Sequence, residues 1–307
     1  MQPKITIFFF LALLFCIIGA MLPSPLAADK ADIHHSVIAG TWYPGDRHQL
    51  SATIQKYLSC SRKVPLGGTP RALIVPHAGY RYSGAVAAHA YRQLKGSGFS
   101  RIILVGPSHY LAFDGVSVNL QSAYETPLGS VPVDLDLARK IISARPDFRW
   151  IRQAHAREHA LEIQLPFLQT VLGNFQIIPI VIGRQDYATA ERLARILAAL
   201  IRGRRDTLLL ASSDLSHYHS SQQARMLDAC FASHVLALDA KGLARDLAAG
   251  KTEACGGGPV MTVLLAAKRL GATKAIILGQ ANSGDVTGDQ GRVVGYLSAV
   301  LIAPFPK

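Results

Sequence analysis

Residues 71–80, RALIVPHAGY, join an apolar run to an abrupt polar ending. The run has the length and composition of a buried strand, which ends at Pro76 and is followed at once by His77. Gly79 then permits a tight turn before a helical pattern begins. This order of strand, turn and helix predicts an α/β fold with a largely parallel sheet.

Two later stretches repeat this arrangement. Residues 101–110, RIILVGPSHY, present His109 after a strand, and residues 207–219, TLLLASSDLSHYH, present Asp214 and His217. Ligands of open α/β sheets bind in the crevice at the carboxyl ends of the strands. We therefore expect the three histidines to meet at one edge of the sheet, although a single histidine in such a place is more often an ordinary loop or core residue.

The rest of the chain alternates short β-rich runs with longer helical patterns, which favours a single domain over 29–307. The predicted strands are 71–76, 101–105, 115–119, 175–182, 206–212, 274–279 and 292–302. The predicted helices are 83–94, 135–144, 159–172, 187–201, 222–238 and 259–270.

A cysteine adds a second kind of donor to the histidines. In residues 252–264, TEACGGGPVMTVL, Cys255 precedes a helix that begins near Pro259. The positive end of a helix lowers the pKa of a nearby thiol and favours metal binding. Imidazole and thiolate together suit iron, copper or zinc rather than magnesium or calcium. The alternative is that Cys255 is a small buried apolar residue beside a glycine turn.

The segment 156–168, AREHALEIQLPFL, holds further titratable residues close together. His159 and Glu162 are three residues apart and form a possible additional site if their helix faces the crevice. With equal weight, Glu158 near the helix start only complements the helix dipole.

Residues 1–28 have the order of an export signal, with one charge, an apolar run over 5–22 and a small-residue pair ending at Ala28. We predict export, with the mature chain beginning near Asp29. Because about 18 apolar residues can span a bilayer, an uncleaved anchor is the alternative. The protein is thus expected to be periplasmic or membrane-anchored by this segment, with no other membrane contact.

The formal net charge is +12, or +11 without Lys4, the single charge of the leader. The basic residues are scattered, and their one tight group, Arg202, Arg204 and Arg205, lies at a predicted helix end, where cations favour the dipole. A basic motif interleaved with aromatic residues is missing from the sequence, so we expect no nucleic-acid partner.

The cysteines outside the leader are Cys60, Cys230 and Cys255. An odd number is not a disulfide framework. Whether Cys60 and Cys230 pair in an oxidising compartment is left open, because the sequence does not place them within bonding distance.

With these residues in view, the chain resembles the Memo family, whose prokaryotic members are called AmmeMemoRadiSam system protein B. The resemblance covers nearly everything after the leader and rests on several motifs in one order. These motifs are AGTWYPGD, PHAGYRYSG, GPSHY, YETPLG, EHALEIQLPF, IIPIVIG, SSDLSH, ACGGGP and NSGDVTGDQGRVVGY.

The family's fold resembles that of class III extradiol dioxygenases, which are non-heme iron enzymes. The resemblance implies an α/β/α sandwich around a central mixed, largely parallel sheet. It also implies a metal bound by His77, His109 and Cys255, with His217 at the position of the dioxygenases' acid/base histidine. Those enzymes use two histidines and a carboxylate. The thiolate here favours iron or copper oxidation chemistry or metal handling, so dioxygenase activity does not follow from the fold.

Three functions are consistent with these residues. The first is an iron- or copper-dependent oxidoreductase in which His217, oriented by Asp214, moves protons. The second is a zinc hydrolase with His217 or Glu162 as base. The third is a non-catalytic protein that binds a metal, peptide or partner. In each case a small-molecule or peptide ligand is expected in the crevice.

Overall fold

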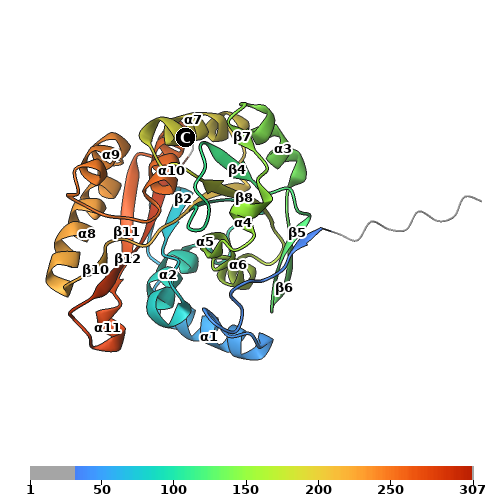
Figure 1. Ribbon diagram of the computed structural model, residues 1–307. Coiled ribbons are helices and arrows are strands. Elements are labelled where there is room, and N and C mark those ends of the chain that lie inside the picture. Colours follow the sequence, from blue (N-terminus) through green and yellow to red (C-terminus); the bar gives the residue numbers. More distant parts are fainter. Residues whose placement is uncertain (1–31, 306–307) are drawn as a thin grey trace, which may run out of the picture. The chain divides into compact units, whose positions relative to one another are not determined.

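The computed structural model describes residues 32–305, and a nine-stranded mixed sheet lies at its centre (Figure 1). The strand order is β10-β12-β2-β9-β3-β8-β4-β7, and β11 pairs with β12 outside this path. The bounds are β2 Thr69–Val75, β3 Arg101–Pro107, β4 Val116–Val118, β7 Phe148–Arg149, β8 Gln176–Ile182, β9 Thr207–Ser212, β10 His217–His219, β11 Lys274–Asn282 and β12 Val293–Ala303.

The four strands β2, β9, β3 and β8 are mutually parallel and form the middle of the sheet. Both flanks are antiparallel, through β12 beside β2 and β4 beside β8. The predicted mixed α/β sheet is confirmed, with four parallel strands at its centre and a further short parallel pair, β4 and β7, at one edge. A small second sheet has the order β1-β5-β6, with bounds Ile33–His34, Ala123–Thr126 and Gly129–Pro132.

Strand β2 shows why the sheet is covered on both faces. Its side chains alternate, so that Ala72 and Ile74 belong to one hydrophobic core while Leu73 and Val75 belong to the other. The first core is closed by α3 Leu135–Ser143, α7 Tyr187–Leu200, α8 Ser221–Leu236, α9 Ala240–Ala248 and α10 Gly257–Arg269. The second is closed by α1 Arg47–Ser59, α2 Tyr80–Leu94 and α6 Leu165–Leu172. These layers form the expected α/β/α sandwich (Figure 1).

All of the predicted strands form, but the helix predicted over 159–172 is broken. It divides into α5, His159–Glu162, and α6, because Pro166 lacks an N–H and its ring clashes with the carbonyl four residues earlier. Four helices were not predicted, namely α1, α9 and the two short helices α4 Arg152–His155 and α11 Gly284–Thr287.

The cysteine pairing that the sequence left open does not form. Cys60, at the end of α1, and Cys230, within α8, are both free thiols, and their helices cover opposite faces of the sheet.

The predicted leader over 1–28 lies outside the described residues. By their contacts, residues 32–305 group into one compact unit. Across 32–305, none of the helices combines the length and the apolar character needed to cross a bilayer.

Candidate metal centre

His77, His109 and Cys255 come together at the carboxyl edge of the parallel strands. His77 follows β2, His109 follows β3, and Cys255 lies just before α10. One nitrogen of each ring and the Cys255 sulfur all lie within 4.8 Å of one another. The Cys255 Sγ is 3.0 Å from His77 Nε2, and the two imidazole rings meet edge to face.

The tautomer of His77 is fixed by Ser212 at the end of β9. The Ser212 hydroxyl donates its proton to the carbonyl of Ala160 at 2.6 Å, so it can only accept at its other contacts. His77 Nδ1, 2.9 Å from the same oxygen, must therefore carry a hydrogen and donate it. The Nε2 lone pair is left facing Cys255.

The tautomer of His109 is fixed in the same way by Glu158. His109 Nδ1 lies 2.8 Å from Glu158 Oε1, and the backbone N–H of His109 donates to Oε2 at 2.8 Å. Burial alone would raise the pKa of Glu158, but the hydrogen bonds from His109 and Ala160 hold it below its usual value. The carboxylate thus accepts from Nδ1–H and leaves Nε2 as a ligand, as carboxylates beside metal-binding histidines commonly do.

The Cys255 sulfur accepts a hydrogen bond from the backbone N–H of Asp214 at 3.3 Å. Burial, followed by the neighbouring Asp214 carboxyl, raises the pKa of this thiol well above its usual range. The expectation that the start of α10 lowers the thiol pKa is therefore wrong in the absence of a metal, because desolvation of a buried thiolate outweighs the helix dipole.

His77 and His159 are held neutral by their surroundings. Burial lowers the pKa of His77 well below its usual value, and the nearby His159 and His109 lower it further. Burial likewise lowers the pKa of His159 to about 4. Neutral imidazole is the form that binds metals, so these rings are ready to act as ligands at neutral pH.

The donor set fits a transition metal. Metal bonds of about 2.0–2.3 Å at tetrahedral angles place neighbouring ligand atoms about 3.3–3.6 Å apart. The three donor atoms need to move little to reach that spacing. Two imidazole nitrogens and one sulfur are too soft for magnesium or calcium.

His217, the expected proton-transfer residue, lines the same pocket. The expectation that Asp214 orients it is wrong. His217 Nδ1 donates to the carbonyl of Leu215 at 2.7 Å, not to Asp214. The Asp214 carboxylate instead accepts from the backbone N–H groups of His77 at 2.7 Å and Ala78 at 3.2 Å. The Asp214 carboxylate thus anchors the turn that carries His77 and does not orient His217.

The possible additional site at His159 and Glu162 is divided by the structure. His159 lines the pocket, stacks on His109 with ring centroids 4.4 Å apart, and packs against Trp42. Glu162 is fully buried elsewhere and accepts hydrogen bonds from the Val37 N–H at 2.8 Å and the Tyr43 hydroxyl at 2.7 Å. It is Glu158 that joins His109 and His159 in a second group of donor atoms within 4.8 Å.

We expect Glu162→Ala to destabilise the fold without removing a metal ligand. The substitution removes the acceptor of the buried Tyr43 hydroxyl and of the partly buried Val37 N–H, and a buried polar group left without a partner costs about 1–3 kcal/mol. The free energy of unfolding, measured with denaturant, should fall by roughly 3 kcal/mol. Glu191→Ala, at an exposed position of α7, is the control and should change it little. Equal losses in the two variants would contradict the anchoring role of Glu162.

The pocket above these ligands has a volume of about 710 Å³ and is strongly aromatic. Trp42, Tyr82, Tyr218 and Tyr296 all line it, and sequence reasoning assigned none of them a role. Tyr218 has a positive φ of 63°, which is unusual for a large side chain and is typical of strained backbone at functional sites. The guanidinium of Arg292 lies over its ring at 5.3 Å.

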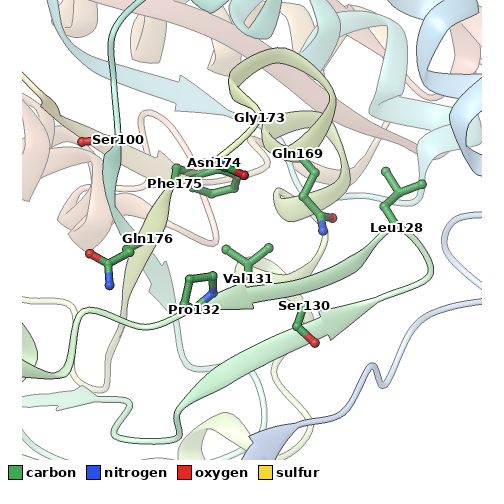
Figure 2. Close-up of a pocket in the computed structure, with 10 residues that line it drawn as sticks. All are labelled: Ser100, Leu128, Ser130, Val131, Pro132, Gln169, Gly173, Asn174, Phe175 and Gln176. Carbon is green, nitrogen blue, oxygen red and sulfur yellow. The ribbon is translucent and has the colours of Figure 1, made fainter.

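A second hollow, of about 570 Å³, lies between β6 and the start of β8 (Figure 2). Figure 2 shows that its wall is made of uncharged side chains, including Gln169, Phe175 and Gln176. Its lining has no titratable group, whereas the aromatic pocket is lined by His77, His109, His159 and His217.

Glu158→Gln is expected to weaken metal binding at the centre by about 10–100-fold, the usual cost of losing a carboxylate that orients a ligand histidine. An amide can present its NH2 group to Nδ1, which removes the preference for the tautomer with a free Nε2. Titration of the metal-free protein with Zn²⁺ against a competing chelator measures the change. Glu125→Gln, which contacts the exposed His35, is the matched control. An unchanged affinity for Glu158→Gln would show that Glu158 does not set the tautomer.

Known proteins match this chain over almost the whole described region. The family described as Memo-like protein matches residues 34–300, which include every ligand and pocket residue named above. A MEMO1 family protein of Sulfolobus acidocaldarius is 40% identical over 274 residues, covering 85% of this chain and 96% of its own. Relatives of the same description from Methanobrevibacter smithii and Aquifex aeolicus are 37% and 36% identical, covering 86% and 88% of this chain and 98% and 99% of theirs.

Proposed function

The chain belongs to the Memo family, and we propose that it is a metal-dependent oxidoreductase in which His77, His109 and Cys255 bind one iron or copper ion. The observation that carries this proposal is that two imidazoles with fixed tautomers and one thiol bring their donor atoms within 4.8 Å of one another. Ser212 and Glu158 each accept a hydrogen bond from Nδ1 and so leave Nε2 free. Histidines that served only to pack the core would not need this arrangement.

The kind of donors favours a redox metal. A thiolate is a soft, electron-rich ligand, and together with imidazoles it supports iron and copper, which can change oxidation state. When bound, such an ion would supply one-electron chemistry or the activation of a small oxidant.

The side chains of the pocket can bind a substrate and accept a proton from it. His217 carries its proton on Nδ1, which donates to a carbonyl, so its Nε2 has a free lone pair that can accept a proton from a bound molecule. Burial lowers the pKa of His217, which keeps the ring neutral and able to act as a base. The aromatic walls and the volume of about 710 Å³ suit a small molecule or a peptide side chain.

A zinc hydrolase is the second candidate, favoured by the neutral His217 beside a site with room for a metal-bound water. His217 is its base, because Glu162 is buried away from the pocket. A non-catalytic protein that binds a metal or peptide in this pocket is the third.

Elemental analysis of protein purified from its own compartment, with spectroscopy of the bound ion, tests the proposal. Iron or copper near one per chain, together with oxidation of a substrate from a panel of small reductants, is the expected result. Zinc with turnover of an ester or amide panel would instead support the hydrolase. A loaded site without turnover on any panel would support the binding protein.

We also propose that the chain is exported and that its mature form begins near Asp29, on the order of residues in the leader. Cell fractionation with N-terminal sequencing should find the processed chain outside the cytoplasm. Full-length chain in the membrane would indicate an uncleaved anchor, and full-length chain in the cytosol would refute export.

A further inference from the structure

A second set of metal-binding side chains lies on the outer helices, away from the pocket. Cys230 and His234 are four residues apart on one face of α8, and Asp246 belongs to α9 (Figure 1). Their donor atoms lie within 4.8 Å of one another, with His234 Nε2 2.8 Å and Cys230 Sγ 3.9 Å from Asp246 Oδ2. We propose that Cys230, His234 and Asp246 bind a zinc ion that clamps α8 to α9.

The ring of His234 is held in the orientation that a ligand needs. With Nε2 directed at Asp246, its Nδ1 lies 3.6 Å from Asp239 Oδ2. Because Nε2 is 2.8 Å from the Asp246 carboxylate, it carries the ring hydrogen in the metal-free protein, and a bound ion would replace that hydrogen while the ring keeps its place between the two carboxylates. Gly242 leaves room for this ring, because a Cβ at that position would lie 2.8 Å from His234 Cε1.

The donors and their surroundings fit zinc. One sulfur, one nitrogen and one carboxylate oxygen are the three ligand types that zinc accepts, at about 2.0–2.3 Å. The observed separations of 2.8 and 3.9 Å lie on either side of the roughly 3.3–3.6 Å between neighbouring ligands of a tetrahedral ion. The His234 and Asp246 side chains are each only 10% exposed, whereas Cys230 is half-buried and gives solvent access for the ion and a fourth, water ligand.

Arg245 is the one competitor for this site among its described neighbours. Its guanidinium donates to both oxygens of Asp246, at 3.0 and 3.4 Å. The Arg245 side chain is 70% exposed, so it can move into solvent when a cation arrives. Solvent at the Arg245 end of this ion pair screens the attraction and weakens the pair. Arg245 is therefore expected to reduce zinc affinity without preventing binding.

Cobalt is the spectroscopic probe for the proposal, because a thiolate bound to Co²⁺ gives a charge-transfer band and Zn²⁺ displaces it. The protein for this test is the full chain with three substitutions. Cys16→Ser and Cys60→Ser remove two other thiols, and Cys255→Ser removes the sulfur of the pocket site. This protein has Cys230 as its remaining thiol. We expect one equivalent of the band on Co²⁺ addition, its loss on Zn²⁺ addition, and a melting temperature raised by Zn²⁺.

The further substitution Cys230→Ser should abolish the band, while restoring Cys60 in its place should not bring the band back. His234→Ala should weaken cobalt binding by more than about ten-fold, since losing even an orienting group costs that much. Arg245→Ala should tighten it by up to about five-fold, the value of an exposed ion pair. This last variant predicts a gain and so remains informative if His234→Ala fails to fold.

Three results would overturn the zinc site. The first is that the protein with Cys230 as its remaining thiol gives no thiolate band. The second is that the band survives Cys230→Ser. The third is that Arg245→Ala binds cobalt more weakly. Because the pocket sulfur is absent from this protein, failure here leaves the function proposed for the pocket untouched, and failure of that function leaves this site standing.

Discussion

His109→Ala is expected to leave the pocket site almost without metal. The change removes one of only three protein ligands, and substitutions of residues that merely orient a ligand already cost about 10–100-fold in affinity. We therefore expect a loss of more than about 100-fold, measured as metal content after dialysis and by chelator competition.

The control for this variant is His48→Ala, at an exposed position of α1. It removes an imidazole of the same kind without touching the site. Equal metal content in the two variants would refute the assignment of His109. Counting metal in the Cys230→Ser background keeps an ion on the outer helices from masking the result.

His217→Ala is expected to keep most of the bound metal while any turnover falls by roughly 10²–10⁴-fold, the usual contribution of a positioned acid or base. The reason is that His217 lines the pocket with a neutral ring but is not one of the three converging donors. Metal content, melting temperature and turnover are measured on one preparation.

His219→Ala is the matched control, since it lies two residues away on β10 and its Nε2 contacts Glu253 at 2.9 Å. Its turnover should stay near that of the unchanged protein. Loss of metal from His217→Ala would make His217 a ligand. Unchanged turnover per folded molecule, with a lower melting temperature, would reduce it to a structural residue.

Much of the fold could be predicted because its central strands are short apolar runs with clear endings. Helix α1 was missed although Asp46 caps it and Leu50, Ile54 and Leu58 recur every four residues, which is a readable helical pattern. The hairpin of β5 and β6 was missed for a different reason. Its strands are only four residues long and carry mixed polarity, so alternation is too brief to detect.

The meeting of His77 and His109 was predictable because strand ends of a parallel sheet share one edge, whereas Cys255, which precedes α10, was placed with them by the family resemblance. The role of Asp214 was not predictable. Its carboxylate bonds to the turn after β2 because β2 and β9 are adjacent, and strand adjacency is not written in the local sequence. Spacing alone likewise could not show that Glu158, rather than Glu162, reaches His109.

Strand β12 sits beside β2 although more than 200 residues separate them along the chain. It also supplies Val294 and Tyr296 to the pocket wall. Contacts between such distant segments form slowly, because a long loop must close first. The pocket is therefore among the last parts of the molecule to be completed during folding, after ribosomal synthesis has delivered residues 293–303. A nascent chain halted before Val293 would already hold His77, His109 and Cys255 but would lack the wall that shelters them.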